Sequence, residues 1–207
     1  MKQLSTRNAA PEYLEAFRTI VSRIEQSLQA TAKLKKPVKM HVAGGAALHF
    51  YTGARISEDI DATFSRRLLL PRDLEVTYRD TEGMPRLLYF DRQYNDAFGL
   101  THEDAGIDSI PLKLQGIDPA IVDVRLLTPI DLAVSKLARF EDVDLHDIRA
   151  LAAAGLLDPE KFRHRAEEAL AAYVGVPDRV RLSLKLACRI VEEAAPDGGK
   201  RTPPRKR

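Results

Sequence analysis

The sequence lacks features that mark several common classes of protein. It has a single cysteine, Cys188, among 207 residues, which excludes an intramolecular disulfide and a cysteine-rich metal site. No apolar run approaches the ~20 residues that a membrane-spanning helix needs, and the first residues lead into polar sequence rather than into the hydrophobic region of a signal peptide. We therefore expect a cytoplasmic protein.

Two common catalytic arrangements are also missing. The five histidines show no HExxH or comparable spacing, which argues against zinc hydrolase chemistry, and no Gly-x-Ser-x-Gly elbow is present for a serine nucleophile. We expect the histidines to be surface or half-buried residues.

The chain carries almost no excess of either charge. Its 32 basic and 30 acidic residues leave a formal charge of +2, so any nucleic-acid binding must depend on where the charges lie. They gather at the C-terminus, where residues 195–207 hold five basic residues, Pro and Gly, and almost no apolar side chains. This composition predicts a disordered tail that either attracts RNA or DNA phosphate or serves only as a solubilising end.

The stretch 38–64 joins a strand, a glycine turn, a helix and an acidic strand. Val38, Met40 and Val42 alternate with polar residues, which predicts a short strand. The pair Gly44-Gly45 then lets the backbone turn sharply into a helix at 46–51, whose first N–H groups are free to face an anion. Taken alone, such a pair is more often a plain turn between a strand and a helix.

An acidic strand is predicted at residues 55–64. Alternation places the apolar residues on one face and Ser57, Asp59 and Asp61 on the other. The two aspartates are then about 6.6 Å apart along the strand. Carboxylates at this spacing favour a divalent cation.

We expect the remaining elements of the first half to support the stretch 38–64. An amphipathic helix is predicted at 11–30, and further strands are predicted at 87–90, 110–114 and 121–126, with a turn-rich loop at 91–106. The helix is expected to bury an apolar row made of Leu14, Phe17, Val21, Ile24 and Leu28.

Asp123 lies between two valines in the last of these strands. A carboxylate in an apolar strand is costly to bury without a partner, so its natural place is a site shared with Asp59 and Asp61. An edge-strand residue that faces water is an almost equally good interpretation.

The second half of the chain is predicted to be helical. Thr128-Pro129 begins a helix that extends to Phe140, and it places Lys136 and Arg139 on one face. Three more helices follow at about 145–152, 159–174 and 177–193. We expect an α/β core at 1–127, a helical region at 128–194 packed on it, and the basic tail.

A Gly-Gly turn that opens a helix, followed by a Ser-x-Asp-x-Asp strand, resembles the signature of the nucleotidyltransferase fold, the polymerase-beta-like superfamily. The later stretch 127–139, with Asp144 and Asp147 beyond it, is similar to the nucleotidyltransferase toxins of the AbiEii and MenT kind and related domain-of-unknown-function proteins. The resemblance implies an α+β fold: a small mixed β-sheet flanked by helices, with a helical C-terminal half.

The resemblance also implies roles for single residues. Asp59 and Asp61 would hold Mg²⁺, the phosphates of a nucleoside triphosphate would lie against Gly44-Gly45 and Ser57, and Lys136 would steady the triphosphate. The acid that follows this lysine would be Asp147, with Asp144 as the second choice. The third carboxylate of the superfamily would be Asp123, Asp91 or absent, and its setting favours Asp123. Where many members have Gly-Ser, this chain has Gly-Gly.

The implied activity is transfer of a nucleoside monophosphate to an RNA hydroxyl. The acceptor would be the 3′ end of a tRNA, and the protein would be the toxin of a toxin–antitoxin pair, with a possible cognate antitoxin. A second hypothesis keeps the chemistry but makes a small molecule or a protein the acceptor. The third is a nucleotidyltransferase-like binding module without activity.

Overall fold

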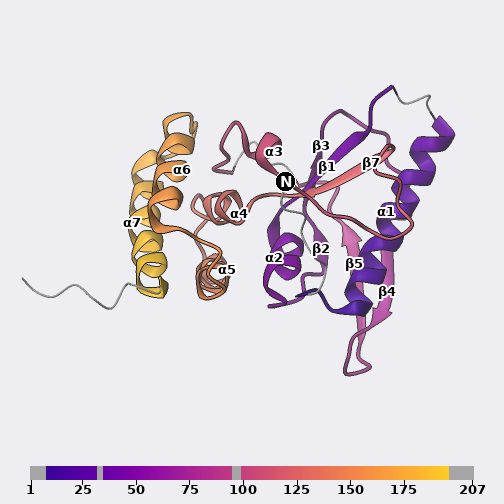
Figure 1. The fold of residues 1–207 in the computed structure, drawn as a ribbon, viewed down its shortest axis with the longest axis horizontal. Coiled ribbons are helices and arrows are strands. Elements are labelled where there is room, and N and C mark those ends of the chain that lie inside the picture. The colour runs from indigo at the N-terminus through magenta and orange to yellow at the C-terminus, as the bar shows by residue number, and fades with distance from the viewer. Residues whose placement is uncertain (1–7, 32–34, 95–98, 196–207) are drawn as a thin grey trace, which may run out of the picture. The chain divides into compact units, whose positions relative to one another are not determined.

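The computed structural model describes residues 8–31, 35–94 and 99–195 of the chain. It confirms the predicted α+β class, with small mixed sheets flanked by helices and a helical C-terminal half (Figure 1). The chain divides into two compact units: residues up to 96 together with 103–128 form the first, and residues 97–102 with those from 129 onward form the second. Beyond Ala195, the predicted tail lies outside the described residues.

The first unit contains two small sheets. One has the order β3-β1-β7-β6, formed by Ala62–Phe64, Val38–Val42, Val122–Leu126 and Ile110–Pro111. In it β1 runs parallel to β7 and antiparallel to β3. The other has the order β2-β5-β4, formed by Asp59–Ile60, Pro85–Phe90 and Glu75–Arg79. Strand β4 is a member that periodicity did not predict.

The predicted acidic strand at 55–64 is wrong as a continuous element. Only Asp59–Ile60 and Ala62–Phe64 are strands, and they belong to different sheets. The carbonyl of Ile60 accepts a hydrogen bond from the Asp91 N–H (3.2 Å), while the carbonyl of Asp61 accepts one from the Ala43 N–H (2.8 Å). The predicted element is therefore divided at Asp61, with β2 in one sheet and β3 in the other.

The N-terminal helix α1 (Pro11–Thr31) packs on strands β4 and β5. Its buried face is rotated slightly from the predicted one: Leu14 is half-buried, whereas Tyr13 and Ile20 are fully buried. The Tyr13 ring meets the rings of His49 and Phe50 edge to face, at centroid distances of 4.7 and 6.1 Å. These aromatic contacts join α1 to α2 (Gly44–Thr52).

His49 is the exception to the expectation of surface or half-buried histidines, since its exposed fraction is 2%. Its Nε2 accepts the Ala10 N–H (3.1 Å), and its Nδ1 lies 2.9 Å from the Ala54 carbonyl. Because a carbonyl only accepts, the Nδ1 carries the proton. The ring therefore joins α2 to the backbone just before α1 and to the backbone just after α2, and its role is structural.

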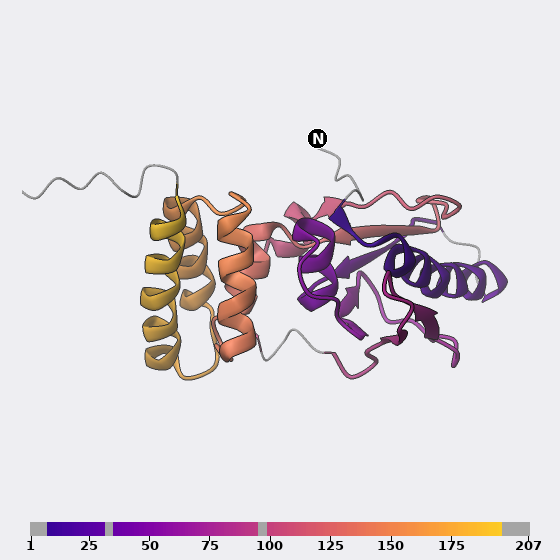
Figure 2. The same ribbon diagram turned by 90° about the horizontal axis from the view of Figure 1, so that it is seen from below.

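The second unit consists of four helices. After α4 (Pro129–Ser135), the helices α5 (Asp142–Ala153), α6 (Pro159–Ala171) and α7 (Pro177–Ala194) lie side by side (Figure 2). Asp131 of α4 is buried and accepts hydrogen bonds from the Arg165 guanidinium at 2.8 and 3.2 Å. This paired charge fixes α4 against α6.

Two local predictions need correction. The helix that begins at Pro129 ends at Ser135 rather than at Phe140, because the next N–H groups bond three residues back and Phe140 adopts a φ of 54°. The loop predicted at 91–106 contains the start of a short helix, α3 (Ala105–Asp108), and its residues 95–98 lie outside the described part of the chain. The predictions of α1, β1, β7 and the last three helices are confirmed.

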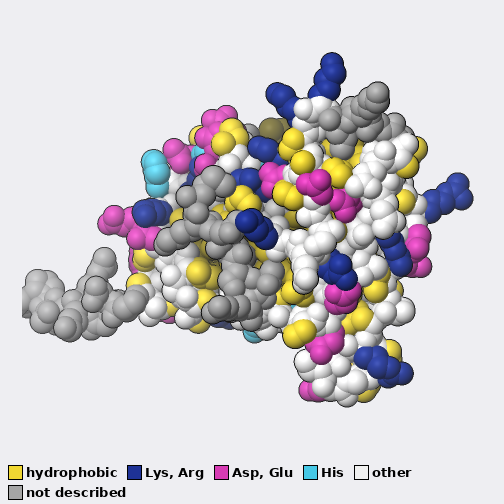
Figure 3. All heavy atoms as spheres, turned by 45° about the vertical axis from the view of Figure 1, so that its right-hand side comes forward, with side chains coloured by type: hydrophobic (Ala, Val, Ile, Leu, Met, Phe, Trp, Pro, Cys, Tyr) yellow, Lys and Arg dark blue, Asp and Glu magenta, His cyan; other side chains and the backbone are white. Residues whose placement is uncertain are grey.

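No helix in the described ranges is long and apolar enough to cross a bilayer. On the face drawn in Figure 3, basic and acidic side chains are interspersed and form no single-signed patch. This agrees with the near balance of charge in the sequence.

The rotated face of α1 predicts different costs for two substitutions on it. Ile20→Ala should lower the free energy of unfolding by about 2–5 kcal/mol, since it leaves a cavity at a fully buried position. Leu14→Ala should cost only about 1 kcal/mol because its side chain is half-buried. Urea unfolding followed by circular dichroism measures both, and equal costs would contradict the observed orientation of the helix.

Candidate active site

The carboxylate of Asp61 lies directly against the first residue of helix α2. Gly44 has a φ of +57°, and a Cβ built on it would lie 1.9 Å from Asp61 Oδ2. Only glycine satisfies both the left-handed backbone and the close approach. The carboxylate is thereby held at the positive end of a nine-residue helix.

Ser57 and Arg55 flank the second glycine in the same way. A Cβ on Gly45 would lie 2.5 Å from Ser57 Oγ and 2.9 Å from Arg55 Nη1. The Ser57 side chain is buried, and its hydroxyl donates a hydrogen bond to Asp59 Oδ1. The structure therefore brings together five predicted residues: Gly44, Gly45, Ser57, Asp59 and Asp61.

Arg55 was not predicted as a site residue. Its guanidinium reaches the backbone of the helix start, where it adds a positive charge beside N–H groups that can face an anion. Its position in the sequence could have identified it, since Arg55 is the only basic residue between the helix at 46–51 and the two aspartates.

Tyr89 is a second residue that the sequence did not single out. It pairs in register with Asp59 across the parallel strands β2 and β5, and its side chain is 38% exposed. The nearby Asp59 carboxylate, together with partial burial and the charges of Asp91, Glu58 and Asp61, raises the pKa of its hydroxyl. The negative charges of the site thus surround one exposed aromatic ring.

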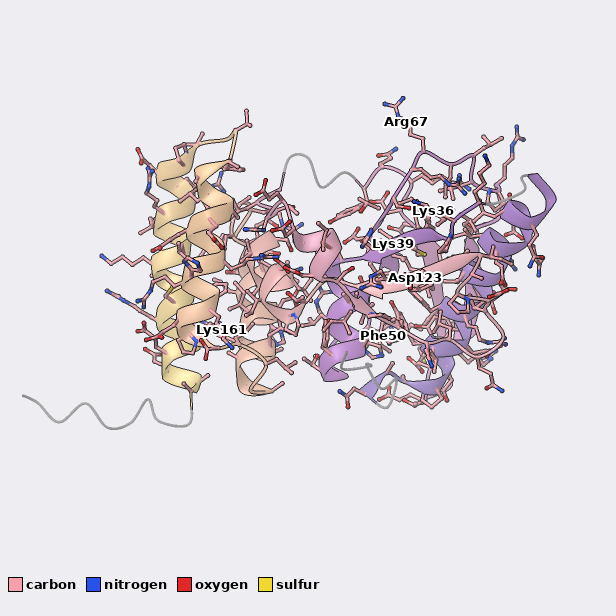
Figure 4. The ribbon with its side chains drawn as sticks, turned by 45° about the horizontal axis from the view of Figure 1, so that its top comes forward. Lys36, Lys39, Phe50, Arg67, Asp123 and Lys161 are labelled. Atoms are coloured by element: carbon pink, nitrogen blue, oxygen red, sulfur yellow. The ribbon has the colours of Figure 1, made fainter. Side chains whose placement is uncertain are left out.

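Asp123 is not brought to the aspartate pair. It stands in register with Lys39 on β1, and it forms an ion pair with Arg125 Nη1 at 3.2 Å (Figure 4). The Asp61 carbonyl accepts a hydrogen bond from Ala43, which directly follows β1 and lies four residues beyond Lys39. Asp61 therefore lies on the side of β1 that faces away from β7. The separation is about 13 Å along the strand and about 10 Å across the sheet. The structure therefore places Asp123 apart from the aspartate pair, in an ion pair with Arg125.

Asp91 is the other candidate for the third carboxylate. It lies closer to the aspartate pair than Asp123 does, because it directly follows the strand that pairs with Asp59 and Ile60. Phe90, the last residue of β5, pairs with Ile60, and the Asp91 N–H donates a hydrogen bond to the Ile60 carbonyl at 3.2 Å. Its Oδ1 accepts the Gln93 N–H at 2.8 Å.

The donor chemistry of this site suits Mg²⁺. Among the described residues, no three His, Cys, Asp or Glu side chains form a group that could hold a metal ion. Mg²⁺ is usually held by one or two carboxylates together with substrate phosphates and water, rather than by a complete protein cage. Asp59 and Asp61 provide such a pair, next to a helix start that can face phosphate.

Lys136 and Asp147 meet within the second unit. The Lys136 ammonium lies 2.7 Å from Asp147 Oδ2 and 3.6 Å from Asp144 Oδ1. Asp144 also accepts two hydrogen bonds of 2.8 Å from Arg139. Lys136, Asp144 and Asp147 are all buried, which makes this a compact buried ion cluster.

The charge state of Asp144 follows from these contacts. Burial alone would raise its pKa, but the hydrogen bonds from Arg139 and the Glu141 N–H, with the charge of Lys136, outweigh that effect. The pKa of Asp144 therefore lies below its ordinary value, and its carboxyl group is ionised at neutral pH.

A comparison with known protein families gives a match to part of the chain. Residues 110–193 match the family model described as nucleotidyltransferase of unknown function (DUF6036). The match supports a nucleotidyltransferase-like domain and, in general terms, nucleotidyltransferase activity. It covers less than half of the chain: the ion cluster lies inside it, and the segment from Gly44 to Asp61 lies outside. Searches of curated proteins and of solved structures gave no match.

The contact between Gly44 and Asp61 predicts a specific cost of adding a methyl group. Gly44→Ala should destabilise the protein by about 1–3 kcal/mol more than Gly83→Ala does, which is the cost of overpacking. Gly83 is the matched control because it also has a positive φ (+79°) but no atom within 4 Å of the added Cβ. Thermal unfolding of the two variants measures the difference, and equal losses would mean that the methyl group meets no obstacle at Asp61.

The buried ion cluster predicts strong coupling between Lys136 and Asp147. Lys136→Met should cost about 3–5 kcal/mol, since it leaves buried carboxylates without their ammonium, whereas Lys136→Met with Asp147→Leu should recover most of the loss. A double-mutant cycle by chemical denaturation gives the coupling energy. The exposed pair Arg181–Asp178, at the same distance of 2.7 Å, is the control and should show about 0.2–1 kcal/mol. Comparable coupling in both pairs would contradict the importance of burial.

Proposed function

We propose that this protein is a Mg²⁺-dependent nucleotidyltransferase that transfers a nucleoside monophosphate from a nucleoside triphosphate to a hydroxyl of RNA, with the 3′ end of tRNA as the acceptor. The observation that carries the proposal is the contact between Asp61 and Gly44. It combines a carboxylate for a divalent cation with a helix start that can face phosphate.

In the proposed complex the triphosphate lies along the Gly44-Gly45 backbone. The N–H groups at the start of α2 and the Arg55 guanidinium bind its oxygens. Mg²⁺ (or Mn²⁺) held by Asp59 and Asp61 would neutralise phosphate charge during the transfer. Ser57 orients the Asp59 carboxylate through its hydrogen bond. Within the second unit, Asp147 and Asp144 position the Lys136 ammonium.

The reaction itself is an in-line displacement. The acceptor oxygen forms a bond to the α-phosphorus, and the bond from that phosphorus to the bridging oxygen breaks, so that pyrophosphate leaves with the bonding electrons. The proton of the acceptor hydroxyl passes to a carboxylate. We assign this role to Asp91, which directly follows the strand that pairs with β2, rather than to Asp123, whose charge is paired with Arg125.

The choice of RNA, and of a toxin as the biological role, is supported by the similarity of stretch 127–139 to toxins of the AbiEii and MenT kind. The agreement with a family described as nucleotidyltransferase supports the chemistry but names no acceptor. In this proposal the protein acts in the cytoplasm, and a cognate antitoxin protein restrains it.

The activity can be tested directly with the full chain. The protein is incubated with Mg²⁺ or Mn²⁺, each of the four labelled nucleoside triphosphates, and total tRNA. We expect label in RNA from at least one nucleotide, and a loss of about 100-fold or more in Asp59→Asn and in Asp61→Asn, since charge stabilisation by a metal is worth several kcal/mol. Glu58→Gln is the matched control because this exposed neighbour carries the same charge and has no assigned role.

Each contrary result identifies a different error. Label that appears in a protein band or a small molecule would replace the RNA acceptor while keeping the chemistry. Absence of transfer from all four nucleotides would overturn the proposal and leave a binding module. An equal loss in Glu58→Gln would show that overall negative charge matters, and not the two aspartates.

A further inference from the structure

A groove of about 470 Å³ lies between helices α6 and α7, within the second unit. Its walls come from one face of each helix, since Arg163 and Glu167 are four residues apart on α6, and Arg181, Lys185 and Arg189 follow one another in steps of four on α7. None of these residues belongs to the proposed active site.

The groove is positively charged. Its lining contains four basic side chains and two carboxylates. Arg163 forms an ion pair with Glu192, which neutralises one charge of each sign. Arg181 is paired with Asp178 at 2.7 Å, but both side chains are more than 60% exposed, so that pair is weak.

The carboxylate of Glu167 and the cations of Lys185 and Arg189 remain in the lining. Lys185 and Arg189 are exposed, and neither has an ion-pair partner within the described part of the chain. With Arg181 they form a straight row along α7, in which successive residues are about 6 Å apart along the helix axis. A row of evenly spaced cations on one rigid helix fits a ligand whose negative charges are also evenly spaced.

The lining also limits how such a ligand can be recognised. Among the nine lining residues there is no aromatic ring on which a base could stack, and no Asn or Gln amide that could read a base edge. The floor includes the apolar side chains of Leu184 and Cys188. The basic side chains can bind phosphates, and the apolar side chains can contact sugars. None of them distinguishes one base from another.

We propose that the α6–α7 groove binds the sugar–phosphate backbone of a single RNA strand without regard to its sequence, and that it holds the acceptor RNA of the transfer reaction. This inference rests on the proposed function for the identity of the nucleic acid. The row Arg181, Lys185 and Arg189 contacts successive phosphates, and the choice of acceptor lies elsewhere.

Binding is measured with the full chain carrying Asp59→Asn and Asp61→Asn, so that no transfer alters the RNA. Fluorescence anisotropy with a labelled single-stranded RNA of mixed sequence gives Kd between about 50 and 200 mM salt. Adding Lys185→Glu with Arg189→Glu should raise Kd about tenfold or more at the lower salt concentration. The milder pair Lys185→Ala with Arg189→Ala should reduce the slope of log Kd against log salt by about 1.4, since each cation that neutralises a phosphate contributes about 0.7 to that slope.

Lys161→Glu is the matched control. Lys161 is exposed near the start of α6 (Figure 4) and does not line the groove. Lys161→Glu makes the same change of charge as a single groove substitution to Glu. It should leave Kd within about twofold of the parent value. Circular dichroism checks that all variants remain folded, which is expected because the substituted side chains are exposed.

The outcomes separate this inference from the proposed function. Unchanged RNA binding in both groove variants, or an equal loss in Lys161→Glu, would overturn the inference even if nucleotidyl transfer occurs. The same holds if an oligoglutamate peptide competes as well as RNA, since the groove would then fit an acidic protein. If RNA binding depends on Lys185 and Arg189 but no nucleotide is transferred, the groove is supported and the proposed reaction fails.

Discussion

The candidate site depends on two consecutive peptide carbonyls that bond to different sheets. Ile60 accepts from the residue after β5, and Asp61 accepts from the residue between β1 and α2. With these two hydrogen bonds, the chain passes from one sheet to the other at Asp61. It also fixes the Asp61 side chain at the start of α2, where only a glycine leaves enough space. The position of the carboxylate is therefore a consequence of the fold of the whole first unit.

The two clusters of charge in this protein serve different purposes. In the second unit, the Lys136 ammonium and the Arg139 guanidinium lie against Asp144, and Lys136 also meets Asp147. Opposite charges at such distances are compensated, which permits their burial. Around Tyr89, by contrast, several carboxylates are near enough to raise the pKa of one hydroxyl. The Arg55 guanidinium supplies a positive charge at the start of α2.

Local patterns in the sequence predicted most of the helices and the strands β1 and β7, since period and capping residues are properties of a short segment. They also predicted Ser57 and Asp61 beside Gly44 and Gly45, but not Arg55. They could not predict the break at Asp61, because it depends on hydrogen bonds to strands far away in the chain. The same reason explains Asp123. Asp123 was predicted to lie within an apolar strand, but only the register shows that Lys39 lies beside it.

The evidence for a nucleotidyltransferase comes from two parts of the chain that do not overlap. The family match begins at residue 110 and includes the ion cluster, whereas the glycines and the aspartate pair lie before it. A chance similarity in one region would not produce the close packing of Asp61 on Gly44 in the other. Conversely, a glycine turn beside two acids would not by itself produce a family match over the helices. Because each observation arises independently, their agreement supports the same chemistry more strongly than either does alone.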